Sequence, residues 1–287
     1  MGPLVVGIDP HLHLLPDSHR ARWESLSGVA RRRAAAEAVT EWSLEVVKGL
    51  SGRVAMVKPQ VALFEQLGSP GVAALETVCA AVKEAGMLLL VDAKRGDIGS
   101  TAEAYARAIL DDDGPIGADA VTISPYLGRD SIAPFLKRCE GGDKGLFVLL
   151  RTSNPGGAEL QKSGGPSPAE LVASWAAEWN RDITAGAGLG PVGVVAGATL
   201  GEELRYWRER LEQSWFLMPG YGAQGASALD TMTGFREDGL GGLVNSSRGV
   251  IFPRPEERSA YEEEIAGHVA RRTDECRAEL FAVVNDS

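Results

Sequence analysis

The chain has 287 residues, and 44% of them are hydrophobic, which is enough for the core of one large α/β domain. Its formal net charge of −10 argues against nucleic acid or an anionic membrane as the main partner, although an acidic protein can hold a phosphate in a local basic pocket. Cys79, Cys139 and Cys276 form no CxxC pair and predict neither a disulfide framework nor a zinc module. We expect a cytoplasmic protein with no signal peptide and no membrane-spanning run.

Short apolar runs alternate with helical patterns along the whole chain. Two runs stop at a charge followed by proline, namely at Asp9-Pro10 and Lys58-Pro59. The apolar runs lie at 4–9, 54–59, 88–94, 120–125, 145–152, 192–198, 215–220 and 241–246, and the helical patterns at about 20–50, 71–85, 100–110, 131–138, 168–184, 201–213, 226–237 and 256–280. Eight strand-helix units predict an α/β fold in which parallel strands close into a (β/α)8 TIM barrel.

We expect residues 1–287 to form a single barrel domain, with an insertion around 156–190 and a long C-terminal helix. An open doubly wound sheet is the main alternative, but Gly7-Ile8-Asp9-Pro10 lacks the spacing of its dinucleotide-binding fingerprint. In a barrel, the carboxyl ends of all strands face one mouth. The polar residues expected there are Asp9, Lys58, Asp92, Lys94, Ser124, Ser153, Gly220 and Arg248.

A dense cluster of charges ends the third apolar run. Asp92 and Lys94 are two residues apart and are expected to share a face of the strand, while Asp97 follows Gly96 in the next turn. A structural ion pair is the simpler alternative. Buried ion pairs are weak stabilisers, however, because desolvation offsets their attraction, so function explains the cluster better.

The loops after the last two strands have the composition of a phosphate site. Residues 218–225 and 245–249 are rich in glycine, which lets backbone N–H groups approach an anion, while Gln224 can donate an amide hydrogen bond and Arg248 a bidentate one. Glycine-rich turns and surface arginines are common singly. At these two positions of a barrel they predict phosphate binding.

With these motifs, the chain resembles the orotidine 5′-phosphate decarboxylase family, in particular its longer bacterial subgroup. The segment from Asp92 to Thr101 is similar to the family's Asp-x-Lys-x-x-Asp signature with its trailing threonine, and Lys58 to the upstream lysine. Asp9 resembles the ribose-binding aspartate, and Ser153 the serine that meets the pyrimidine. Gln224 and Arg248 resemble the phosphate ligands, and Gln224 lies on the loop from Gly220 to Gly225, which closes over the base.

The resemblance implies decarboxylation of orotidine 5′-monophosphate to UMP and CO2, without metal or organic cofactor. Lys94 would protonate C6, Asp92 and Asp97 would hold its ammonium, and Lys58 would orient Asp92 and the ribose hydroxyls. The resemblance also implies a homodimer in which Asp97 and Thr101 reach the neighbouring subunit's site.

Four other functions remain to be weighed against this one. His11 and His13 could bind a metal in a hydrolase, but His19 and His268 lie at no later strand end. A sugar-phosphate epimerase would need metal ligands that are not apparent, and a Schiff-base aldolase needs a lysine of lowered pKa, which two aspartates beside Lys94 oppose. A catalytically silent nucleotide binder would have no use for Asp97.

Overall fold

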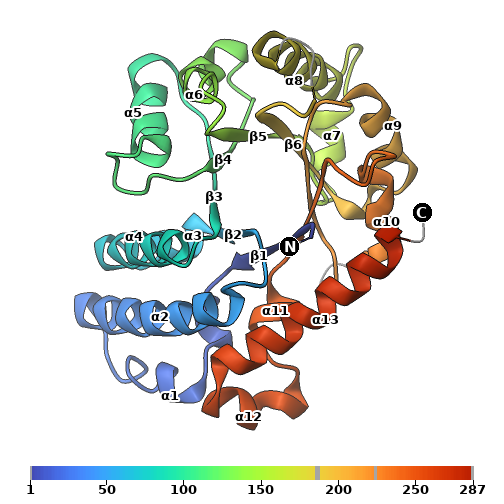
Figure 1. The fold of residues 1–287 in the computed structure, drawn as a ribbon. Helices are drawn as coiled ribbons and strands as arrows, with labels where there is room; N and C mark the ends of the chain where they lie inside the picture. The colour runs from blue at the N-terminus through green and yellow to red at the C-terminus, as the bar shows by residue number, and fades with distance from the viewer. Residues whose placement is uncertain (1, 185–187, 223–224, 286–287) are drawn as a thin grey trace. The chain divides into compact units, whose positions relative to one another are not determined.

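Eight parallel strands pair in chain order and close into a barrel, which confirms the predicted (β/α)8 fold (Figure 1). The computed structural model describes residues 2–184, 188–222 and 225–285. Its strands are β1 (Leu4–Ile8), β2 (Met56–Pro59), β3 (Leu88–Arg95), β4 (Ala120–Ile123), β5 (Gly145–Arg151), β6 (Val192–Ala196), β7 (Phe216–Pro219) and β8 (Gly242–Ser246). Each lies within or close to its predicted run.

Helices separate the strands, as expected for βα units. They are α1 (Asp17–Arg20), α2 (Gly28–Leu50), α3 (Val61–Glu65), α4 (Ser69–Glu84), α5 (Gly99–Leu110), α6 (Ala133–Cys139), α7 (Gly157–Gln161), α8 (Pro168–Thr184), α9 (Glu202–Arg210), α10 (Ala228–Thr231), α11 (Arg248–Ile251), α12 (Arg258–Glu263) and α13 (Ile265–Asn285). No helix in the described part of the chain is long and apolar enough to cross a membrane.

The chain divides into two compact units. The first comprises the residues up to Ala93 together with Ser246–Phe281, and the second comprises Lys94–Asn245 with the residues from Ala282 onward. The division falls inside β3, between Ala93 and Lys94. Each unit is therefore described by itself.

In the first unit, α2 lies beside α4 (Figure 1) and buries a face with helical spacing that includes Ala35, Val39, Trp42 and Val46. The Trp42 indole donates to the Tyr261 hydroxyl at 2.6 Å, and that hydroxyl donates to a backbone carbonyl of α11 at 2.8 Å. These buried bonds attach α11, which begins with a predicted site residue, to the core of the unit.

In the second unit, a buried asparagine joins α8 to the start of β6. The Asn180 side chain is fully buried, donates to the Val192 carbonyl at 2.7 Å and accepts from the Val192 N–H at 2.9 Å. Burying an amide costs little free energy when both its N–H donor and its carbonyl acceptor are hydrogen-bonded. The two bonds fix the position of α8 along the direction of β6. The predicted insertion around 156–190 therefore contains two helices. Its first part forms α7, and its second part forms α8, which packs on the barrel.

Two predicted helices are interrupted. The 256–280 pattern contains α12 and α13, which are separated at Glu264, where φ is −148° and ψ is 81°. The 226–237 pattern contains only the short α10 and a 3-10 turn. This segment packs closely on β7, because a Cβ atom at Gly234 would lie 2.3 Å from the Met218 sulfur. Sequence periodicity does not reveal such a contact.

Candidate active site

Lys58, Gln60 and Asp92 form a buried polar cluster at the ends of β2 and β3. The Lys58 Nζ atom lies 2.7 Å from Oδ2 of Asp92, and the Gln60 amide donates to the same oxygen at 3.0 Å. The Lys58 and Asp92 side chains are 5% and 8% exposed. Gln60 pairs with Asp92 across the two strands, and Lys58 lies two residues earlier on the same face. Strand register thus brings two of the predicted site residues together.

Lys58 is held as a cation. Burial opposes its charge, but the carboxylates of Asp92 and Asp9, with the hydrogen bond to Asp92, outweigh this effect and raise the pKa of Lys58 above its usual value. A lysine with a raised pKa is a poor nucleophile at neutral pH. Lys58 can therefore orient and neutralise carboxylates, but it is unsuited to imine formation.

Asp9, which follows β1, has a free hydrogen-bond acceptor. Its Oδ1 atom is buried and has no hydrogen-bond partner within the described ranges. A buried carboxylate oxygen without a donor costs free energy until water or a ligand supplies one. The geometry is suited to accepting a hydrogen bond from a ligand hydroxyl.

The loop after β8 packs against β1. A Cβ atom at Gly7 would lie 2.0 Å from Oγ of Ser247, so only glycine at this position admits the loop. Arg248 follows as the first residue of α11 and is exposed. Burial lowers the pKa of the half-buried His11, and Arg248 lowers it further, while Asp9 opposes the shift. Asp9 and Arg248 thus both act on His11 at one corner of the first unit.

Lys94 begins the second unit with an unusual backbone conformation. Its φ is 46°, and it is the only non-glycine residue with positive φ in ranges 2–184, 188–222 and 225–285. Its side chain is exposed, while its N–H donates to the buried Thr122 hydroxyl at 3.0 Å. The regular alternation of strand faces, from which Asp92 and Lys94 are expected to share a face, does not hold through a residue with this φ.

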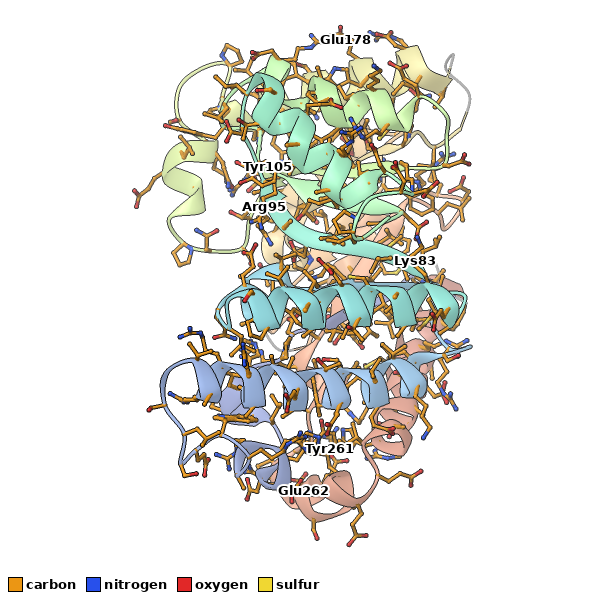
Figure 2. The ribbon with its side chains drawn as sticks, turned by 90° about the vertical axis from the view of Figure 1, so that its left-hand side faces the viewer. Lys83, Arg95, Tyr105, Glu178, Tyr261 and Glu262 are labelled. Carbon is orange, nitrogen blue, oxygen red and sulfur yellow. The ribbon has the colours of Figure 1, made fainter. Side chains whose placement is uncertain are left out.

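Asp97 and Thr101 flank the start of α5. The Asp97 carboxylate accepts from the Ile98 N–H at 2.8 Å, and Thr101 is exposed on the first helical turn. Nearby, the guanidinium of Arg95 lies over the Tyr105 ring at 5.5 Å, and Figure 2 shows the two side chains side by side. This contact attaches the end of β3 to α5.

Ser153 follows β5 beside an extensive hydrogen-bond network. Buried Arg151 donates Nε and Nη2 to Glu203 at 2.6 and 3.3 Å and Nη1 to Gln161 at 2.7 Å. Gln161 also accepts from the Thr152 N–H at 3.0 Å and donates to its hydroxyl at 2.8 Å. Burial works against ionisation of Glu203, but the hydrogen bond from Arg151 helps lower its pKa to about 2. The network fixes the backbone immediately before Ser153.

Gly220 directly follows β7 and has a φ of 110°, a conformation that favours glycine. Its carbonyl accepts from the Ala226 N–H at 3.3 Å, so the two ends of the predicted closing loop meet. Gln224, the predicted phosphate ligand within this loop, lies outside the described residues.

The described residues hold no group of three or more His, Cys, Asp or Glu side chains arranged to bind a metal. His11 and His13 lie with ring centroids 5.8 Å apart in the turn after β1. A cavity of about 930 Å³ exists elsewhere in the second unit, lined by residues such as Arg208 and Arg236, but no predicted site residue lines it.

Gln60, Thr122 and Gln161 contact predicted site residues or their neighbours but were not predicted. Gln60 has a signal in the sequence, because it lies two residues after Lys58 and so shares its face. Thr122 belongs to an apolar run, where a threonine is an ordinary β-strand residue. Gln161 lies in the insertion, and its contact with Thr152 depends on how α7 folds back.

The chain is similar to known proteins over most of its length. Residues 2–263 match the family described as orotidine 5′-phosphate decarboxylase / HUMPS. Orotidine 5′-phosphate decarboxylase of Rhodopirellula baltica is 43% identical over 258 residues, covering 88% of this chain and 84% of the relative. The enzyme of that name from Salinispora tropica is 42% identical over 97% of this chain and 94% of its own.

The structural likeness covers the whole chain. The structure of Leishmania donovani OMP decarboxylase superimposes with a TM-score of 0.75 at 32% identity, covering 100% of this chain and 95% of that one. The resemblance predicted from the sequence is thereby confirmed: the chain belongs to the orotidine 5′-phosphate decarboxylase / HUMPS family.

Proposed function

We propose that this protein decarboxylates orotidine 5′-monophosphate to UMP and CO2, the last step in the synthesis of UMP, without a metal or an organic cofactor. The observation that carries the proposal is the buried Lys58–Asp92 pair, followed in β3 by Lys94 and, beyond the end of the strand, by Asp97. Relatives that are more than 40% identical to the chain over the matched residues are named for this activity.

The reaction requires stabilisation of a localised carbanion. The bond between C6 and the carboxylate carbon breaks, CO2 leaves, and both bonding electrons remain on C6. The Lys94 ammonium attracts this charge and transfers a proton to C6, and the resulting amine regains a proton from water. Asp92 and Asp97 hold the ammonium, and Lys58 orients Asp92.

Substrate binding falls to residues at other strand ends. Asp9 accepts from a ribose hydroxyl through its free oxygen, and Thr101 assists from α5. Ser153 contacts the pyrimidine. The phosphate ligands are Arg248, Gln224 and the backbone from Gly220, and their binding energy contributes to catalysis when the loop closes over the base.

The direct test follows loss of orotidine 5′-monophosphate absorbance with purified protein and a chelator. We expect turnover at the same rate with and without the chelator. Activity that vanishes with the chelator and returns with zinc would refute the metal-free reaction. Activity on ribulose 5-phosphate but none on orotidine 5′-monophosphate would support the sugar-phosphate epimerase alternative.

Arg248→Ala should weaken UMP binding by about 1.5–3 kcal/mol, because it removes a charge-assisted hydrogen bond to phosphate, and should leave uridine binding unchanged. Calorimetric titration with both compounds measures the two effects. Arg254→Ala, which removes another exposed arginine from the same segment, serves as the control. Unchanged UMP binding with weaker uridine binding would place Arg248 away from the phosphate.

The active protein is proposed to be a homodimer in the cytoplasm, with Asp97 and Thr101 serving the partner subunit's site. Ile98, beside Asp97, is 58% exposed, and Tyr126 and Leu127 after β4 are 76% and 47% exposed. Apolar side chains exposed next to functional residues are typical of an interface. The three cysteines are buried, and none of them forms a disulfide within the described residues, as suits a reducing compartment.

Mixing two inactive variants tests the shared site. A Lys94→Ala subunit still supplies Asp97, and an Asp97→Ala subunit still supplies Lys94. Under subunit exchange, half of the dimers should be mixed and should hold one intact site each, restoring up to about a quarter of the wild-type activity. If a tag proves exchange and activity stays at the level of the separate variants, Asp97 acts within its own subunit.

A further inference from the structure

We infer that Thr122 is a positioning residue for the reaction, because its buried hydroxyl holds the peptide N–H of Lys94 and thereby aims the lysine side chain. This inference rests on the proposed role of Lys94 as proton donor. Thr122 lies in β4, is 1% exposed, and accepts the Lys94 N–H at 3.0 Å.

The strained backbone of Lys94 makes this hydrogen bond consequential. An L-residue with φ of 46° has unfavourable contacts at its Cβ, so the conformation persists only where neighbouring groups enforce it. In parallel strands φ is about −120°. Compared with that value, the φ of 46° at Lys94 rotates its Cβ atom by roughly 165° about the N–Cα bond. The direction of the side chain therefore depends on this local geometry.

Residues of β4 and of the turn directly after it hold the chain on both sides of the Lys94 Cα atom. Thr122 of β4 accepts the Lys94 N–H, and the N–H of Ser124, which follows β4, donates to the Arg95 carbonyl at 2.7 Å. Gly96 lies close to the same turn, because a Cβ atom there would lie 3.1 Å from the Ser124 carbonyl oxygen.

The side chain of Lys94 is exposed, so packing along its stem contributes little to its direction. A proton donor must lie within hydrogen-bonding reach of the reacting carbon, and an error of about 1 Å can lower a rate about 100-fold. The backbone at the Cα atom sets the origin of the side chain, while the carboxylates proposed to hold the ammonium act at its far end. Thr122 fixes that origin.

Thr122→Val tests the inference, because valine keeps the branched shape and removes the acceptor. We expect kcat for orotidine 5′-monophosphate to fall about 10–100-fold, with UMP affinity within about twofold of wild type. Thr122→Ser, which restores the hydroxyl, should recover most of the rate. Thr273→Val is the matched control, since Thr273 is also buried and its hydroxyl is also bonded to the backbone, in this case donating to a carbonyl within α13.

The outcomes separate this inference from the proposed function. No turnover by the wild type would refute the function itself. If the wild type turns over and the kcat of Thr122→Val is within twofold of the wild-type kcat, the positioning role is overturned. It is also overturned if Thr122→Val loses UMP affinity by the same factor as it loses kcat. If Thr122→Val does not fold, Gly96→Ala decides, because its added methyl group displaces the chain after Lys94: reduced kcat with normal UMP affinity supports the inference, and normal kcat overturns it.

Discussion

Lys94→Ala is expected to lower kcat for orotidine 5′-monophosphate at least about 10⁴-fold. The substitution removes the proposed proton donor, which contributes about 10²–10⁴-fold in typical enzymes, and the charge that stabilises the carbanion, which contributes about 10²–10³-fold. The fold should survive, because the side chain is exposed and fills no core volume. Initial rates and circular dichroism on the same preparation measure the two properties.

Arg95→Ala is the matched control for this loss. It removes the adjacent cation and its contact with Tyr105, but no group that the reaction uses. Its kcat should stay within a few-fold of wild type, whereas a loss as large as that of Lys94→Ala would show that the end of β3 tolerates no change. Near-normal turnover by Lys94→Ala would refute the proposed proton donor.

Lys58→Met is expected to destabilise the protein by about 3–5 kcal/mol and to abolish most activity. Methionine fills similar volume, but the buried Asp92 carboxylate loses an ammonium 2.7 Å away, and breaking a buried pair from one side is costly. Urea unfolding measures the free energy of unfolding. A loss below about 1 kcal/mol would show that solvent reaches the carboxylate and that the pair contributes little.

A second substitution separates stability from chemistry at this pair. In Lys58→Met with Asp92→Asn, the buried charge is gone, so most of the lost free energy of unfolding should return. Activity should not return, because the proposed reaction needs the carboxylate beside Lys94. Recovery of both would mean that the pair is structural only.

The pH dependence of the Lys58→Met effect has a defined sign. The folded pKa of Lys58 lies above its usual value of 10.5, so the stability that its charge contributes is fully present below about 10.5. It is lost as pH rises through the folded pKa. The difference in unfolding free energy between wild type and Lys58→Met should therefore be constant from neutral pH to about 10.5 and should shrink above it.

The barrel could be predicted because each βα unit is encoded locally. Apolar runs such as 120–125 end at proline, and helical periodicity resumes after them, so count and order follow from the sequence alone. Helix interruptions could not be predicted in this way. The segment that contains Gly234 packs so closely on Met218 of β7 that a Cβ atom would not fit there, and that contact joins segments that pattern analysis treats separately.

The sequence alone determined the (β/α)8 fold, the membership in a family and the residue types at the strand ends, because these depend on local patterns and motifs. Only the tertiary structure decided their environments. The register of β2 on β3 joined Gln60 to the Lys58–Asp92 pair, and burial with two carboxylates set the pKa of Lys58. Lys94 has a positive φ, and its N–H is bonded to Thr122, which lies 28 residues later on the neighbouring strand. No local propensity encodes a contact at that separation.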